Sequence, residues 1–149
     1  MKRTGITSAW LAILVVALGC RTHVPAATGD AASDLGGTSW QLVKFQASDD
    51  TTLTPDEKAK YTIAFTSEGG VSARIDCNRG RGTWTSSGPN QLQLGLLALT
   101  RAMCPPAPLT ERLPRDWALV RSYTIRQGHL FLALMADGGI YELEPLPGS

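Results

Sequence analysis

The run Cys77-Asn78-Arg79-Gly80-Arg81-Gly82 contains the residue types best suited to chemistry in this chain. Its two arginines could bind an anion, because each guanidinium presents a planar fork of hydrogen-bond donors. The same run also has a structural interpretation, since glycine allows a tight turn and an Asn side chain can bond to the backbone within a turn. We favour the structural interpretation and keep Asn78, Arg79 and Arg81 as a candidate recognition turn.

Cysteine chemistry is the second candidate. The chain has three cysteines, Cys20, Cys77 and Cys104. If Cys20 carries a lipid, an even pair remains, and in an oxidising compartment such a pair is typical of a disulfide. Closing this loop should stabilise the domain by about 3 to 4 kcal/mol in the chain-entropy model. The alternative is a metal or redox site, for which the sequence lacks both CxxC spacing and a Cys/His cluster.

The other polar residues do not form a recognisable catalytic, metal or nucleotide-binding pattern. The chain has two histidines, His23 and His129, so no nucleophilic triad can be assembled, and His129 is expected at the solvated start of a strand. The carboxylates between residues 49 and 57 lack the ligand spacing of a Ca²⁺ loop. No glycine-rich nucleotide motif occurs. We therefore predict no catalytic residue, no metal, no cofactor and no enzymatic activity.

The N-terminus is typical of an export signal. Lys2 and Arg3 precede an apolar stretch from Ala9 to Leu18, and Gly19 and Cys20 follow it. As a helix, this stretch would reach about 15 Å, half of a bilayer core, so it predicts a cleaved signal and not a permanent span. Cys20 after Leu-Gly resembles the lipobox of bacterial lipoproteins. That resemblance implies a signal peptide over residues 1–19 and a diacylglycerol on the Cys20 thiol, with a fatty acid such as palmitate on the new N-terminus.

Residues 20–34 are predicted to be a lipidated cysteine and a flexible tether. The segment is rich in Thr, Ala, Gly and Pro, with Val24 as its one branched apolar residue, so it cannot bury a core. Several acyl chains would hold the protein firmly to its membrane. Arg21, and not Asp, follows the cysteine. The sorting rule of enterobacterial lipoproteins then implies the outer membrane of a Gram-negative cell, with the domain facing the periplasm.

Residues 35–149 have the length of a single domain with its own core. Counted from the sequence, this segment contains eleven Lys plus Arg and eleven Asp plus Glu, so it is formally neutral. Nucleic-acid binding needs a strongly basic surface, so we exclude nucleic acid as a partner. We expect a monomer whose partners are the membrane, through its lipid, and other envelope proteins.

Period-two alternation predicts that most of this domain is β-strand. Residues 61–66 and 71–77 form one predicted hairpin, and residues 123–143 form a three-stranded meander with turns at Gly128 and Gly138. The apolar parity slips between Leu42 and Val43, which indicates a bulge or burial on both faces.

Helical spacing occurs in one stretch, through Leu109, Leu113, Trp117 and Val120. Thr110 is its expected cap, and Pro114 should delay or kink it. The predicted fold class is α+β, a curved and partly barrel-like antiparallel sheet with one amphipathic helix packed on it.

Three short motifs occur in a fixed order: Gly37-Thr38-Ser39-Trp40-Gln41-Leu42-Val43, Cys77-Asn78-Arg79-Gly80-Arg81-Gly82-Thr83-Trp84 and Thr100-Arg101-Ala102-Met103-Cys104-Pro105-Pro106. Together with Val120-Arg121-Ser122-Tyr123, they resemble the META domain, the HslJ-like family of heat-inducible bacterial lipoproteins, over residues 35–145. This resemblance implies a β-rich envelope domain without established catalysis, with roles in heat stress and antibiotic tolerance attributed to some members. We therefore expect a membrane-anchored, non-enzymatic binding or stabilising module. The alternative is a hydrolase or ligand-sequestering lipoprotein with a buried pocket.

Overall fold

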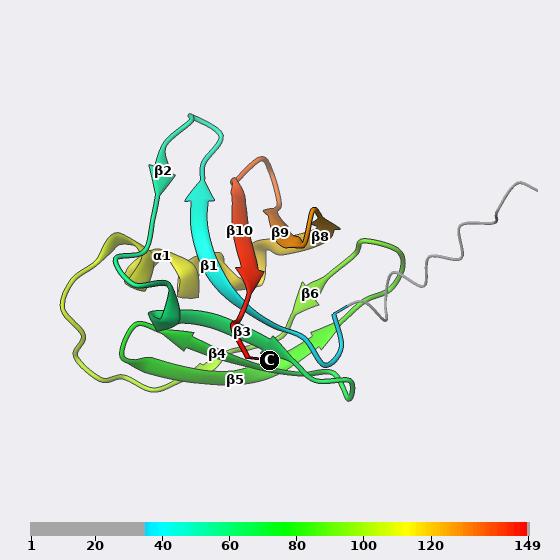
Figure 1. Cartoon of the computed structure of the whole chain (residues 1–149), viewed down its shortest axis with the longest axis horizontal. Helices are drawn as coiled ribbons and strands as arrows, with labels where there is room; N and C mark the ends of the chain where they lie inside the picture. The colour runs from blue at the N-terminus through cyan, green and yellow to red at the C-terminus, as the bar shows by residue number, and fades with distance from the viewer. Residues whose placement is uncertain (1–34, 149) are drawn as a thin grey trace, which may run out of the picture.

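The computed structural model describes residues 35–148 (Figure 1). The expected signal peptide, Cys20 and the expected tether lie outside the described residues. The strands are β1 (Ser39–Gln46), β2 (Thr52–Leu53), β3 (Tyr61–Phe65), β4 (Gly70–Ile75), β5 (Asn78–Thr85), β6 (Gln93–Leu94), β7 (Ala98–Leu99), β8 (Val120–Arg126), β9 (His129–Leu134) and β10 (Ile140–Pro145). The helices are η1 (Lys58–Lys60), α1 (Pro108–Asp116) and η2 (Trp117–Leu119), of which η1 and η2 are 3₁₀ turns.

One antiparallel sheet contains all of these strands. Its order is β6-β5-β4-β3-β1-β10-β9-β8, with β2 added beside β1 and β7 beside β5. The two ends of this order come together, because the amide of Tyr123 donates to the carbonyl of Asn90 at 2.9 Å and the amide of Leu92 donates to the carbonyl of Arg121 at 3.1 Å. The sheet is therefore curved into a nearly closed barrel. The predicted α+β architecture with one packed helix is confirmed.

The alternation in the sequence corresponds to the inner and outer faces of the sheet. Tyr61, Ile63 and Phe65 are buried, and the intervening residues of β3 are partly exposed. In the last meander, Gln127 and Gly128 form the turn between β8 and β9 with φ angles of 52° and 78°. The register between β1 and β10 shifts between Leu42 and Lys44, so the structure has the bulge, which was one of the two alternatives indicated by the sequence.

The core fills the inside of the barrel. Its buried apolar side chains are Leu35, Trp40, Leu42, Phe45, Tyr61, Ile63, Phe65, Val71, Ala73, Ile75, Trp84, Leu92, Leu94, Leu109, Leu113, Trp117, Val120, Tyr123, Leu130, Leu132, Leu134, Tyr141 and Leu143. They come from nearly every strand and from α1, so the inner face of the sheet and one face of the helix share a single hydrophobic core.

Helix α1 packs on β1 and β10 through apolar contacts and a buried polar network. The Tyr141 hydroxyl donates to Asp116 Oδ2 at 2.7 Å, and Arg112 Nε donates to the same oxygen at 2.9 Å. The Arg112 guanidinium also lies 4.0 Å from the centre of the Phe45 ring. Burial, followed by the hydrogen bond to Asp116, raises the pKa of Tyr141. Asp116 is thus buried with partners that satisfy it.

The ends of the helix differ from the sequence-based expectation. Thr110 is not the cap, because the N-cap residue is Ala107 and Pro108 occupies the first turn, where its ring presets the helical φ. The Thr110 hydroxyl instead bonds to the Tyr61 hydroxyl at 2.8 Å. Pro114 lies inside α1, which gives way to η2 after Asp116. Val120 already belongs to β8. Within residues 35–148, no helix has the length and apolar character needed to cross a bilayer.

The prediction of a glycine-rich turn at residues 78–82 is wrong. Residues 78–82 belong to strand β5, and the turn before it consists of Asp76 and Cys77, because Ile75 pairs directly with Asn78. The glycines serve close packing: a Cβ at Gly82 would lie 2.7 Å from the carbonyl oxygen of Leu96, and one at Gly80 would lie 2.7 Å from Leu97 Cδ1. Gly80 and Gly82 therefore leave room for the chain at residues 96–99 to lie against β5.

Candidate functional site

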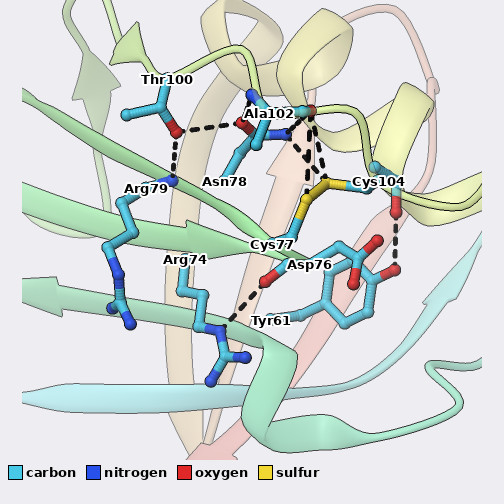
Figure 2. The surroundings of a disulfide bond; sticks show 10 residues. Tyr61, Arg74, Asp76, Cys77, Asn78, Arg79, Thr100, Ala102 and Cys104 are labelled. Atoms are coloured by element: carbon cyan, nitrogen blue, oxygen red, sulfur yellow. Dashed lines mark hydrogen bonds between the residues drawn. A yellow bond between two sulfur atoms is a disulfide. The ribbon is translucent and has the colours of Figure 1, made fainter.

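The buried amide of Asn78 attaches residues 100–104 to the start of β5. Asn78 Nδ2 donates to the carbonyl of Ala102 at 3.2 Å and to Cys104 Sγ at 3.0 Å. Asn78 Oδ1 accepts from the Ala102 amide at 2.8 Å and from the Thr100 hydroxyl at 3.0 Å. Figure 2 shows these bonds converging on one side chain. All hydrogen-bonding atoms of this amide are therefore used in holding an irregular segment in place.

Backbone bonds and a disulfide complete this attachment. The amide of Arg79 donates to the Thr100 hydroxyl at 3.0 Å, and the amide of Thr100 donates to the carbonyl of Arg79 at 3.0 Å. Cys77 and Cys104 are bonded to each other, with their Cα atoms 5.7 Å apart and a sequence separation of 27. The predicted pairing is therefore present in the structure. We call the set Cys77, Asn78, Thr100, Ala102 and Cys104 the Asn78 clasp.

The sequence-based metal or redox alternative concerns the same cysteines. One carboxylate oxygen of Asp76 lies within 4.8 Å of both sulfur atoms, a grouping that metal sites also use. A metal binds the thiolate form of cysteine, and sulfurs bonded to each other have no thiolate to offer. In the disulfide-bonded state, the cysteines are therefore part of the scaffold.

The two arginines of the motif point away from the clasp. Arg79 and Arg81 alternate with the buried Asn78 and the glycines, so both side chains are exposed on the outer face of β5. Arg74 on β4 lies directly opposite Arg79 in the sheet. Its Nε donates to the carbonyl of Asp76 at 3.0 Å and its Nη1 to the carbonyl of Ala59 at 3.2 Å.

These three arginines line a groove of about 490 Å³ on the outside of the sheet, together with Thr62, Ser72 and Thr100. Within residues 35–148, none of the three forms an ion pair with a carboxylate. We call Arg74, Arg79 and Arg81 the arginine face. Its chemistry suits an anionic group, which a guanidinium binds with two parallel hydrogen bonds.

Sequence reasoning did not include Arg74 among the candidate residues, although a signal existed. Val71, Ala73 and Ile75 were expected to face inward, so Arg74 had to face outward. What the sequence lacked was the register that places Arg74 beside Arg79, because that pairing depends on the length of the Asp76-Cys77 turn.

His129 lies at the start of β9 as expected, but it has a partner. Its Nδ1 lies 2.8 Å from Glu142 Oε1, and Glu142 also pairs with Lys44 at 3.4 Å. These residues lie on adjacent strands, and their side chains are partly exposed. The pair is explained as a cross-strand contact on the outer face of the sheet.

Comparison with known families identifies the domain. The model of the META domain family matches residues 33–144, which is most of the chain. The chain belongs to the META domain family. The resemblance drawn from the three sequence motifs is therefore confirmed. In this META domain, the second motif forms the turn and β5, and the third motif forms the segment held by the Asn78 clasp.

Solved structures share this fold at low sequence identity. An NMR structure of a protein from Burkholderia xenovorans is 22% identical, with a TM-score of 0.64, and the match covers 78% of this chain and 87% of that one. A crystal structure of a DUF4847 family protein from Bacteroides vulgatus is 13% identical, with a TM-score of 0.57, and the match covers 78% and 97% of the two chains. A search of curated proteins found no match. The similarity to these structures establishes the fold of this META domain and no more.

The disulfide leads to a test by double mutation. Cys77→Ser and Cys104→Ser should each lower the free energy of unfolding by about 3 to 4 kcal/mol, because each removes the same crosslink. The double variant should add little further loss, since the two effects are not independent. Urea unfolding followed by tryptophan fluorescence measures all three. Losses that add up in the double variant would show that the cysteines act separately.

Proposed function

We propose that this META domain protein is an envelope lipoprotein that acts as a non-enzymatic binding module. The anchor is a lipid on Cys20, supported by the order of Lys2, Arg3, the apolar stretch and Gly19 before that cysteine. Arg21 supports sorting to the outer membrane, with the domain facing the periplasm. The family resemblance supports a link to envelope or heat stress and to antibiotic tolerance.

The arginine face is the observation that carries the binding role. Three guanidinium groups lie on neighbouring strands around one groove, and no carboxylate of the described residues pairs with them. The neutral domain therefore has a local positive surface that is open to an outside anion. We propose that its partner is an acidic surface of another envelope protein, bound by charge-assisted hydrogen bonds.

A non-enzymatic role is supported by three sets of polar groups that are held within the scaffold. The Asn78 amide is saturated by hydrogen bonds, the cysteines are bonded to each other, and Asp116 is held by Tyr141 and Arg112. The apolar cavity beside Asp116 holds about 20 Å³. This is room for about one water molecule, well below the roughly 300 Å³ or more of a small-molecule pocket. The cavity thus gives little support to ligand sequestration inside the barrel.

The proposed anchor predicts a clear difference in fractionation. The parent protein should partition into the detergent phase and sediment with outer membranes, because several acyl chains hold it there. Cys20→Ser should remain in the aqueous phase, since it lacks the thiol that carries the lipid. The two proteins are compared by phase separation and by separated inner and outer membranes. Equal partitioning of both proteins would contradict the proposed anchor, and the parent in the inner membrane alone would contradict the proposed sorting to the outer membrane.

The proposed binding role predicts that two arginines can be removed without unfolding the domain. Arg79→Ala combined with Arg81→Ala should change the free energy of unfolding by less than about 1 kcal/mol, because both side chains are solvated. The same variant should lose the partners crosslinked to the protein in intact cells. Arg101→Ala combined with Arg115→Ala is the matched control, because it removes two other exposed arginines. An unchanged set of crosslinked partners in the first variant would refute the role of the arginine face.

A further inference from the structure

A second cleft lies beside the clasp, with chemistry opposite to that of the arginine face. It holds about 410 Å³ and lies between the chain around Pro55, the Asp76-Cys77 turn and the proline-rich segment 105–108 before α1. Its walls include Leu53, Pro55, Pro105, Pro106 and Leu109. Prolines and leucines give this cleft an apolar lining, and the proline rings restrict the backbone of its walls.

Asp76 lines this cleft, and its carboxylate has no partner among the residues that the structure describes. The residue is 8% exposed, and its backbone has a φ of 55°, which only a few residue types adopt readily. Its amide donates to the carbonyl of Lys60 at 2.8 Å, and its carbonyl accepts from Arg74 Nε at 3.0 Å. Its side-chain oxygens accept no hydrogen bond from any residue in the range 35–148. Figure 2 shows this carboxylate beside the ring of Tyr61.

The neighbouring polar groups are already engaged. Lys60 Nζ donates to Asp56 Oδ2 at 2.8 Å and lies 3.8 Å from Glu57 Oε2. The hydroxyl of Tyr61 bonds to Thr110 at 2.8 Å. The cleft lining therefore contains two carboxylates and one ammonium group, and that ammonium pairs with the carboxylate of Asp56. The carboxylate of Asp76 is therefore mostly enclosed and has no cationic partner among residues 35–148, which favours a cation from outside.

We propose that this cleft binds a primary ammonium group carried on an apolar stem. The ammonium would donate to the carboxylate of Asp76, while the stem would pack against Pro105, Pro106 and Leu53. A hard metal ion fits less well, since Ca²⁺ needs six to eight oxygen ligands and the other carboxylate of the lining is already paired with Lys60. A free amphipathic amine and a lysine side chain of another protein share this chemistry. This site uses neither the arginine face nor its anionic partner.

The test uses the lipidated protein in nonionic micelles and three small probes. Butylammonium has the four-carbon stem and charge of a lysine side chain, butanol has the stem alone, and N-acetyl-lysine methylamide presents lysine as a polypeptide does. Amide chemical shifts of residues lining the cleft report binding. We expect butylammonium to shift the amides of Tyr61, Asp76 and Leu109, and butanol at the same concentration to shift them far less.

Two variants test whether the carboxylate of Asp76 binds the ammonium group. Asp76→Asn should weaken binding of butylammonium at least about tenfold, the loss expected for one charge-assisted hydrogen bond. It should melt no lower than the parent, because Asn tolerates positive φ and removes a mostly enclosed charge that has no partner among the described residues. Asp137→Asn is the matched control, since Asp137 has a φ of 54° in another turn and is exposed. This control should bind as the parent does.

Some outcomes identify which kind of ammonium ligand binds, and others test whether the site exists at all. Binding of both ammonium probes supports a lysine of a partner or a free amine, and binding of butylammonium alone supports the free amine. Equal shifts with butanol would overturn the proposal, because the stem alone would then bind. Full binding by Asp76→Asn, or no shift with either ammonium probe up to about 10 mM, would overturn it as well.

Discussion

The attachment of residues 100–104 to the start of β5 is the constraint on which the rest of this META domain depends. The Asn78 amide and the Cys77–Cys104 bond fix this irregular segment to the sheet. The chain then continues directly into α1, whose Leu109 and Leu113 fill the barrel. The indole of Trp117 donates back to the carbonyl of Gly95 at 2.9 Å, so the helix end is also tied to the chain beside β5. Release of the segment would therefore expose part of the core.

The same attachment positions the two surfaces proposed to bind. Alternation along β5 directs Asn78 inward and Arg79 and Arg81 outward. One motif therefore supplies both a buried residue that stabilises the fold and two exposed residues that can bind a partner. Cys104 precedes the prolines that form one wall of the Asp76 cleft, and its bond to Cys77 fixes that wall beside Asp76. Residues 74–81 thus contribute to the clasp and to both candidate sites.

The sequence predicted those features of the fold that depend on residues close together in the chain. Period-two alternation predicted the β3–β4 hairpin and the last meander, and a slip in it indicated either a bulge in β1 or burial on both faces. These features could be predicted because the burial of each side chain follows from its position in its own strand. Prediction failed where contacts are distant in sequence: Gly80 and Gly82 were taken for turn residues, although their lack of a Cβ accommodates Leu96 and Leu97. The partners of Asn78 lie 22 to 26 residues away, so its role had no local signal. The cleft around Asp76 also depends on residues distant in sequence, because its walls include Pro55 and Pro105, so the sequence did not reveal that this carboxylate has no partner among residues 35–148.

The most direct measurement of this account is the native-state hydrogen exchange of the Ala102 amide, which donates to Asn78 Oδ1 at 2.8 Å. We predict that this amide is protected in the parent and exchanges much faster in Asn78→Ala, with the disulfide intact in both proteins. The amides of β9, which lies between β8 and β10, should remain protected in the variant. An Ala102 amide that exchanges equally fast in both proteins would show that Asn78 does not hold this segment.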